Sequence, residues 1–177
     1  MEKATGYSLW LRPFGNIAFS LRQRIQKLSK KYDTPDFEPH VTLLGGLDAG
    51  EQELIQWTDM LGHSIAPFDI ILTRLATGNS FYQSLFIEIE KTDELMNARR
   101  RAEELFDVKS TTPFRPHLSL LYSDFSVPEK KRLLNTMSQE FDLRFKATNV
   151  LLIKSEGTPD QWEKVHAVNF SESAPQI

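Results

Sequence analysis

The chain has 177 residues, of which 40% are hydrophobic and 25% charged, and its 21 basic and 24 acidic residues give a formal net charge of −3. This composition is typical of one globular domain, and the near balance of charge excludes the broad cationic surface with which proteins bind duplex nucleic acid. The absence of cysteine excludes disulfides, thiolate catalysis and cysteine-based zinc sites.

The first part of the chain predicts a strand, a helix and a second strand. Residues 7–12 have the composition of a strand, and apolar residues at helical spacing predict an amphipathic helix over 17–32. Residues 40–44 again have strand character. The Gly45-Gly46 pair that follows is expected to end this second strand.

The middle of the chain predicts a helix followed by a β-hairpin. The helix is expected over residues 51–61, with Asp48 and Glu51 in capping-box spacing. Residues 68–76 and 84–90 are each of strand length, and the second segment alternates apolar and polar side chains. The turn-forming residues 77–80 lie between them, so the two strands are expected to pair.

The last part of the chain predicts two more helices and three strands. A helix is expected over residues 94–106, and a strand over 117–121. Ser126 and Glu129 have the spacing of a capping box for the next helix, with Pro128 in its first turn. The closing strands are predicted near 150–154 and 162–170.

The order of these elements favours an α+β fold, because strand-helix-strand-helix-strand occurs twice with hairpin-length links. We expect two pseudo-symmetric lobes, each an antiparallel β-sheet backed by helices, around a central groove within a single domain over residues 1–177. No segment approaches the roughly 18 apolar residues of a membrane span, and the first residues lack the apolar region of a signal peptide. A cytoplasmic or nuclear protein, acting as a monomer away from membranes, is therefore expected.

A six-residue motif occurs twice in the chain. Residues 39–44 read Pro-His-Val-Thr-Leu-Leu, and residues 116–121 read Pro-His-Leu-Ser-Leu-Leu. Because side chains alternate along a strand, His40 and Thr42 are expected on one face, as are His117 and Ser119. A chance repeat of a His followed two positions later by a hydroxyl is common, but the shared Pro and Leu-Leu make coincidence a poor explanation.

The paired motifs fit the hydrolysis of a cyclic phosphodiester. This reaction needs a proton taken from the attacking water on one side of phosphorus and a proton given to the departing sugar oxygen on the other. Two imidazoles across a groove supply both, with His117 as the expected base and His40 as the acid. Thr42 and Ser119 can donate hydrogen bonds to the non-bridging oxygens, so neither a metal nor another cofactor is required.

The chain resembles the 2H phosphoesterase superfamily, whose LigT-like fold carries two His-x-Thr/Ser motifs in two lobes. Within it, the chain is most similar to the cyclic phosphodiesterases that act on ADP-ribose 1″,2″-cyclic phosphate, a by-product of tRNA splicing. The resemblance extends along nearly the full chain, through residues 7–10, 77–78, 81–83 and 111–122. It implies catalytic or phosphate-binding roles for the four motif residues, and a role for Tyr122 at the phosphate or its water. Strict strand alternation would turn Tyr122 away from His117, so a bulge or the strand end must redirect it.

Several other residues are candidates for ligand contact. Phe81 and Tyr82 can stack on an adenine, with core packing as the competing interpretation. Trp10 and Gln83 match positions of the family, although burial is the alternative for Trp10. Arg115 can meet the phosphate or remain a solvated surface residue.

Two rival functions remain open at the level of sequence. One is an RNA-end enzyme that opens or ligates 2′,3′-cyclic termini, which the acidic composition disfavours. The other is a catalytically inactive nucleotide-binding module. The expected partner in the preferred interpretation is a small cyclic phosphate nucleotide, converted to its phosphomonoester.

Overall fold

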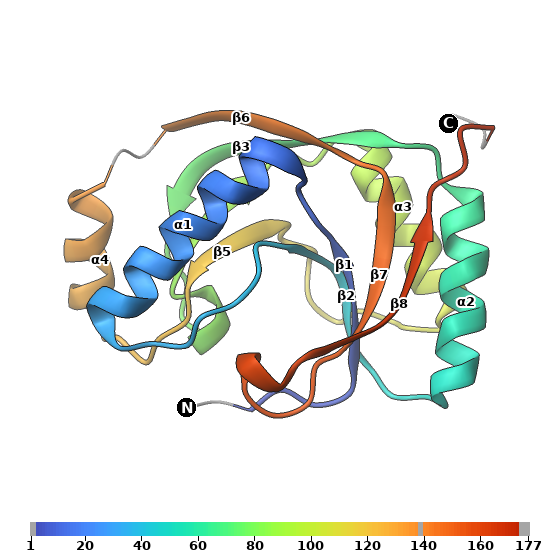
Figure 1. Ribbon diagram of the computed structural model, residues 1–177, viewed down its shortest axis with the longest axis horizontal. Coiled ribbons are helices and arrows are strands. Elements are labelled where there is room, and N and C mark those ends of the chain that lie inside the picture. Colours follow the sequence, from blue (N-terminus) through green and yellow to red (C-terminus); the bar gives the residue numbers. More distant parts are fainter. Residues whose placement is uncertain (1–2, 138–139, 174–177) are drawn as a thin grey trace.

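The protein is built around one curled antiparallel sheet, seen in the computed structural model, which describes residues 3–137 and 140–173 (Figure 1). In these residues eight strands follow the order β6-β3-β4-β5-β2-β1-β7-β8. The strands are β1 (Tyr7–Leu11), β2 (Val41–Leu47), β3 (Phe68–Ala76), β4 (Leu85–Ile89), β5 (His117–Leu121), β6 (Glu140–Ala147), β7 (Asn149–Lys154) and β8 (Glu163–Asn169). The helices are α1 (Gly15–Tyr32), α2 (Glu51–Ser64), α3 (Asp93–Leu105) and α4 (Val127–Asn135), with 3₁₀ turns η1 (Phe81–Gln83) and η2 (Pro159–Gln161).

The α+β prediction with two related lobes is confirmed, and the lobes are the two halves of one sheet. Each half has four of the described strands, and they meet where β2 pairs with β5. The units β1-α1-β2 and β4-α3-β5 correspond, and each helix packs on the central strand of the other half, α1 on β5 and α3 on β2. The halves are therefore interlocked through their helices, which holds their two central strands together.

The helices form where the sequence predicts them. Leu21, Ile25 and Leu28 lie on the buried face of α1, at the spacing that predicted an amphipathic helix. The capping box of Ser126 and Glu129 begins α4 as expected. The predicted capping box of Asp48 and Glu51 is wrong, because α2 begins at Glu51 itself after the N-cap Gly50.

The predicted end of the second strand is wrong. Gly45-Gly46 does not end β2, which continues to Leu47. On β1 the partners of Leu44 and Leu47 are Leu9 and Tyr7, so β2 has one extra residue and forms a bulge, for which Gly46 supplies a φ of +69°.

Strand β6 was missed, although Phe141, Leu143 and Phe145 alternate with charged residues in the period of a strand. It pairs antiparallel with β3 at the end of the sheet.

In the described residues, no helix is long and apolar enough to cross a bilayer.

Helix α2 packs closely on β8 through a glycine. A Cβ atom added to Gly62 would lie 2.4 Å from Cγ1 of Val168. We expect Gly62→Ala to lower the free energy of unfolding by about 1–3 kcal/mol through overpacking, with partial recovery when Val168→Ala is added. Urea denaturation measures both changes. A more stable Gly62→Ala protein, as helix propensity alone would give, would contradict this packing.

Candidate active site

The two repeated motifs meet at the centre of the sheet. In each motif one residue separates the histidine from the hydroxyl residue. These two residues, Val41 on β2 and Leu118 on β5, are direct antiparallel partners, and both are fully buried in the core. Continuing this register by one residue sets His40 opposite Ser119 and His117 opposite Thr42. Cross-strand neighbours of this kind have Cβ atoms roughly 4.5–5.5 Å apart, and diagonal neighbours roughly 7–8 Å. The pairing therefore gathers two imidazoles and two hydroxyls on one face of the sheet.

These four side chains line a cavity of about 350 Å³. The remaining lining residues are small, polar or aromatic, namely Ala4, Thr5, Ser8, Trp10, Gly45, Gly46, Ser80, Tyr82, Gln83, Tyr122, Ser155 and Trp162. Among the described lining residues, the histidines are the only side chains whose ordinary pKa lies near neutral pH. The cavity is large enough for a small ligand, and its chemistry is that of imidazole, hydroxyl and aromatic groups.

His40 is held on both its nitrogen and its ring face. Its Nδ1 lies 2.6 Å from the carbonyl oxygen of Glu38, and its ring stacks on Trp10 with centroids 3.5 Å apart and planes 4° apart. Because a carbonyl only accepts hydrogen bonds, Nδ1 carries the proton and Nε2 is left to act on a ligand. The side chain is 7% exposed and forms part of the cavity wall.

His117 is oriented by the same device in the other half of the sheet. Its Nδ1 donates to the carbonyl oxygen of Arg115 at 2.8 Å, again two residues upstream. Its ring contacts Phe86 edge to face, with centroids 5.1 Å apart, and it is less buried than His40. Both histidines therefore carry their proton on Nδ1 and leave Nε2 as an acceptor.

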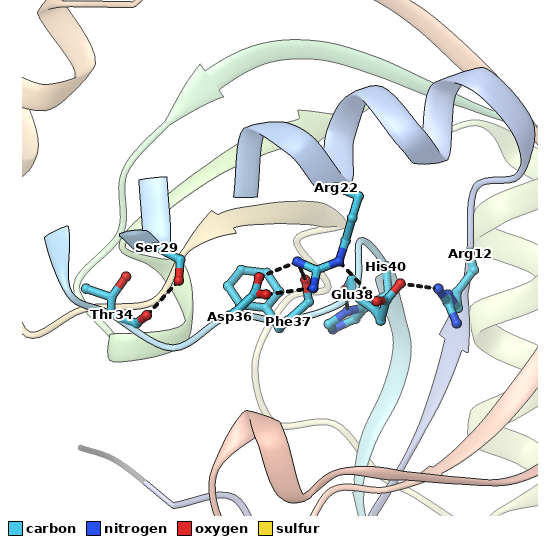
Figure 2. Close-up of polar contacts among 8 residues, drawn as sticks. All are labelled: Arg12, Arg22, Ser29, Thr34, Asp36, Phe37, Glu38 and His40. Atoms are coloured by element: carbon cyan, nitrogen blue, oxygen red, sulfur yellow. Dashed lines mark hydrogen bonds and ion pairs between the residues drawn. The ribbon is translucent and has the colours of Figure 1, made fainter. Parts of the chain in front are cut away.

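Ion pairs hold the loop between α1 and β2, and they thereby position Glu38 and His40 (Figure 2). Arg22 of α1 bonds Asp36 through both guanidinium ends and lies 3.1 Å from Glu38 through Nε. Arg12, directly after β1, pairs with the same Glu38 at 2.5 Å. The carbonyl that fixes the tautomer of His40 is thus anchored from two elements.

Burial lowers the pKa of both histidines. The pKa of His40 is lowered to about 3, mainly by desolvation and to a smaller extent by the nearby His117 and Arg12, against the opposing hydrogen bond to the Glu38 carbonyl. Desolvation also lowers the pKa of His117 against the opposing hydrogen bond to the Arg115 carbonyl, and the charge of Arg115 adds a smaller lowering. Both imidazoles are consequently neutral at pH 7 in the free protein.

The low pKa of His40 predicts a loss of stability in acid. Between about pH 6.5 and about pH 3 the unfolded chain binds a proton at this residue that the folded protein does not, so the free energy of unfolding falls as the pH falls. Urea denaturation from pH 7.5 to pH 4 is expected to show a shallower decline for His40→Gln than for the parent protein. Equal declines in the two proteins would contradict the assignment.

The hydroxyls of Ser119 and Thr42 differ in their hydrogen bonds in the free protein. Ser119 donates to the carbonyl oxygen of Tyr82 at 2.8 Å, and its side chain also hydrogen-bonds Tyr122. The Thr42 hydroxyl has no hydrogen-bond partner among the described residues, so it is available to a ligand. Burial raises the pKa of Tyr122, which keeps its phenol protonated as a hydrogen-bond donor.

Tyr122 reaches the cavity because β5 ends at Leu121. The strand end thus provides the redirection that strict alternation required. The ring of Tyr122 stacks on Phe37, with centroids 3.7 Å apart and planes 14° apart. It is 3% exposed, so its place in the wall is fixed by packing.

The structure separates the other predicted ligand contacts. Trp10, Tyr82 and Gln83 lie in the cavity wall. Phe81 lies in the hydrophobic core, 6% exposed, and is absent from the wall. Arg115 is also outside the cavity, because its guanidinium lies over Phe86 and pairs with Glu88 at 2.8 Å.

Sequence reasoning missed several wall residues, of which Trp162 is the largest. Its position before the last strand carried no motif that would single it out. Ser8 and Ser155 were also missed; they share a hydrogen bond of 2.7 Å across β1 and the end of β7. No group of three or more His, Cys, Asp or Glu side chains able to hold a metal occurs in the part of the chain that the structure describes.

Comparison with known proteins identifies the family. A family model described as cyclic phosphodiesterase-like protein matches residues 5–170. A cyclic phosphodiesterase of Arabidopsis thaliana is 27% identical, over 93% of this chain and 95% of that protein. A 2′,3′-cyclic-nucleotide 3′-phosphodiesterase of Yarrowia lipolytica is 26% identical, over 93% of this chain and 100% of that protein.

Two solved structures show the same fold. The crystal structure of the protein TT0787 of Thermus thermophilus has a TM-score of 0.67 at 16% identity, covering 96% of this chain and 98% of that one. The crystal structure of Escherichia coli LigT complexed with 3′-AMP has a TM-score of 0.63 at 11% identity, covering 96% and 99%. The chain therefore belongs to the cyclic phosphodiesterase-like protein family and is a phosphodiesterase of the 2H phosphoesterase type.

Proposed function

We propose that this protein opens a small cyclic phosphodiester to a phosphomonoester, using His40 and His117 as its acid and base. The proposed substrates are ADP-ribose 1″,2″-cyclic phosphate and nucleoside 2′,3′-cyclic phosphates. The observation that carries the proposal is the direct pairing of Val41 with Leu118, which brings both His-x-hydroxyl motifs to one cavity. The names of the Arabidopsis and Yarrowia relatives support the same reaction class.

The proposed reaction moves one proton at each imidazole. Nε2 of His117 takes a proton as water attacks phosphorus, and Nε2 of His40 gives a proton to the sugar oxygen as its bond to phosphorus breaks. One water is consumed, and exchange with solvent restores both histidines. The two residues supply both proton transfers, so the scheme needs no metal.

Two observations support this division of roles. His117 is the more exposed of the pair, which suits the residue that must meet water. His40 lies flat on Trp10, and an aromatic face favours a cation above it. Because His40 is neutral in the free protein, the negative charge of the bound phosphodiester must raise its pKa before it can act as an acid.

A substrate with a better leaving group separates the two roles. When sulfur replaces the bridging oxygen that departs, the thiolate leaves without a proton from the enzyme. We expect this substrate to restore much of the lost kcat to His40→Ala and little to His117→Ala. Restoration in His117→Ala alone would reverse the assignment.

The remaining donors are proposed to bind the phosphate. Thr42 offers its unbonded hydroxyl, and Ser119 must rotate away from the carbonyl of Tyr82 to offer its own. Tyr122 remains protonated, so it can donate a hydrogen bond but cannot act as a base. Hydrogen bonds from these donors stabilise the negative charge that develops on the non-bridging oxygens, and Tyr122 is already held in place by its stack on Phe37.

The proposal is tested with a panel of substrates after treatment with a metal chelator. The panel contains ADP-ribose 1″,2″-cyclic phosphate, adenosine 2′,3′-cyclic phosphate and an oligoribonucleotide with a 2′,3′-cyclic end. We expect turnover of at least one of the small substrates, with a higher kcat/KM than for the oligomer. Binding of AMP without turnover of any cyclic phosphate would contradict the proposal and favour a binding module.

A further inference from the structure

The aromatic residues of the cavity wall differ in whether their faces are already covered. One face of Trp10 is covered by the parallel ring of His40, and one face of Tyr122 by the parallel ring of Phe37. These stacks fix the position of His40 and of the Tyr122 hydroxyl. Trp10 and Tyr122 therefore serve mainly to hold the catalytic groups in place.

Trp162 is different, because no ring among the described residues lies parallel to it. Its neighbours meet it at angles of 72° for Trp10, 58° for Tyr122, 75° for His40 and 39° for Tyr82. The side chain is only partly buried and lines the cavity. Trp162 packs against the hydrophobic clusters, but no parallel ring stacks on its indole among the described residues.

No hydrogen bond from the indole N–H to a described residue holds Trp162 in place. Nε1 is buried and has no hydrogen-bond partner among the residues that the structure describes. A buried indole N–H usually donates a hydrogen bond to an acceptor, and leaving this hydrogen bond unmade is unfavourable. The unmade hydrogen bond of this wall residue therefore calls for an explanation other than packing stability.

The segment before Trp162 is fixed at the mouth of the cavity. Thr158 and Gln161 form a capping box around η2, and the backbone of Gly157 pairs with Ala4, both N···O distances being 3.0 Å. In Figure 1 this orange-red turn lies near the N-terminal end of the chain, apart from the helices. Ala4 and Ser155 line the same cavity, so the segment places Trp162 beside the histidines.

We propose that Trp162 stacks on the nucleobase of the substrate while its phosphate lies between His40 and His117. This inference rests on the proposed function and names the part of the substrate that the cavity recognises beyond the cyclic phosphate. Every base has a face that an indole can cover, so stacking accepts all four bases. Larger purines bury more of the ring, and they are expected to bind more tightly than pyrimidines.

Kinetics with and without a base test this proposal. Trp162→Ala is expected to raise KM for adenosine 2′,3′-cyclic phosphate by roughly tenfold or more, with kcat changed by less than about threefold. Trp162→Phe, which keeps a smaller ring, is expected to fall between. Glycerol 1,2-cyclic phosphate lacks a base, and its KM is expected to stay unchanged in all variants. The control is Trp57→Phe, which changes a tryptophan of α2 that packs on Phe106 outside the cavity.

The alternative role for Trp162 is to support Trp10 and, through it, His40. A supporting residue would affect both substrates equally and would lower kcat, so equal losses on the two substrates overturn the stacking proposal. The thermal midpoint of each variant is measured in parallel, and Trp162→Phe provides the comparison if Trp162→Ala does not fold.

A binding readout separates this inference from the proposed function. The chain has 3 Trp residues, and 3′-AMP is expected to quench the fluorescence of the parent protein and of Trp57→Phe more strongly than that of Trp162→Phe. If the parent protein turns over no cyclic phosphate, the proposed function fails, and the quenching alone decides the stacking. Equal quenching in all three proteins would overturn it.

Discussion

Replacing either His40 or His117 with alanine is expected to lower kcat for a cyclic phosphodiester by a factor of roughly 10²–10⁴. Each imidazole presents one Nε2 to the cavity, and no other titratable side chain among the described wall residues can take over either proton transfer near neutral pH. Because the two residues act in one transition state, the double variant is expected to be little worse than the poorer single variant. Steady-state kinetics on adenosine 2′,3′-cyclic phosphate measures all three.

His63→Ala is the matched control for these variants. His63 is exposed near the end of α2 and does not line the cavity, so near-normal kcat is expected. Circular dichroism and thermal midpoints confirm that the variants fold. Near-normal kcat in His40→Ala or His117→Ala would contradict the paired mechanism.

Replacing Thr42 with valine is expected to lower kcat on the order of 10²-fold with little change in stability. Valine keeps the shape of the side chain and removes only the hydroxyl, which has no hydrogen-bond partner among the described residues. The loss therefore falls on the phosphate in the transition state and not on the fold. The measurement is kcat together with the free energy of unfolding of the same variant.

Ser119→Ala provides the comparison, because its hydroxyl already bonds the carbonyl of Tyr82 and the side chain of Tyr122. Removing it leaves buried polar groups unpaired, so we expect a loss of about 1–3 kcal/mol in stability in addition to the loss of kcat. The pair of variants thus separates catalysis from stability. A stable and fully active Thr42→Val would remove Thr42 from the phosphate site.

The sequence predicted that the four motif side chains share one surface because the motif combines a residue pattern with a strand period. Alternation along β2 and β5 was enough to place each imidazole with its hydroxyl on one face and Val41 or Leu118 on the other. The motif repeat also predicted two related halves. It could not show that the halves share one sheet, because strand pairing between distant segments leaves no local signal.

Other features of the site depend on tertiary contacts that no short pattern encodes. The low pKa of His40 arises from burial beneath Trp10 and the loop held by Arg22, which comes from a different element. Arg115 stands close to His117 in the sequence, yet Glu88 of β4 holds its guanidinium outside the cavity. Trp162 lies in the cavity wall after the connection between β7 and β8, where Gly157 pairs with Ala4, another wall residue.

Some errors came from local signals that were available. Strand β6 has the alternation of a strand, and its omission left the sheet one strand short. The Gly45-Gly46 pair predicts a strand end, whereas β2 continues through it with a bulge, and both glycines line the cavity. A glycine pair is compatible with either outcome, and only the pairing partner on β1 decides between them.

The central claim is that two histidines from the two halves of the sheet contact a single phosphate. A crystal structure of the protein with 3′-AMP tests it most directly, since this ligand carries the phosphate group of the proposed product. We predict that Nε2 of His40 and Nε2 of His117 each lie at hydrogen-bond distance, about 2.6–3.2 Å, from oxygens of the same phosphate. A phosphate that contacts only one of the two rings, or neither, would contradict the account.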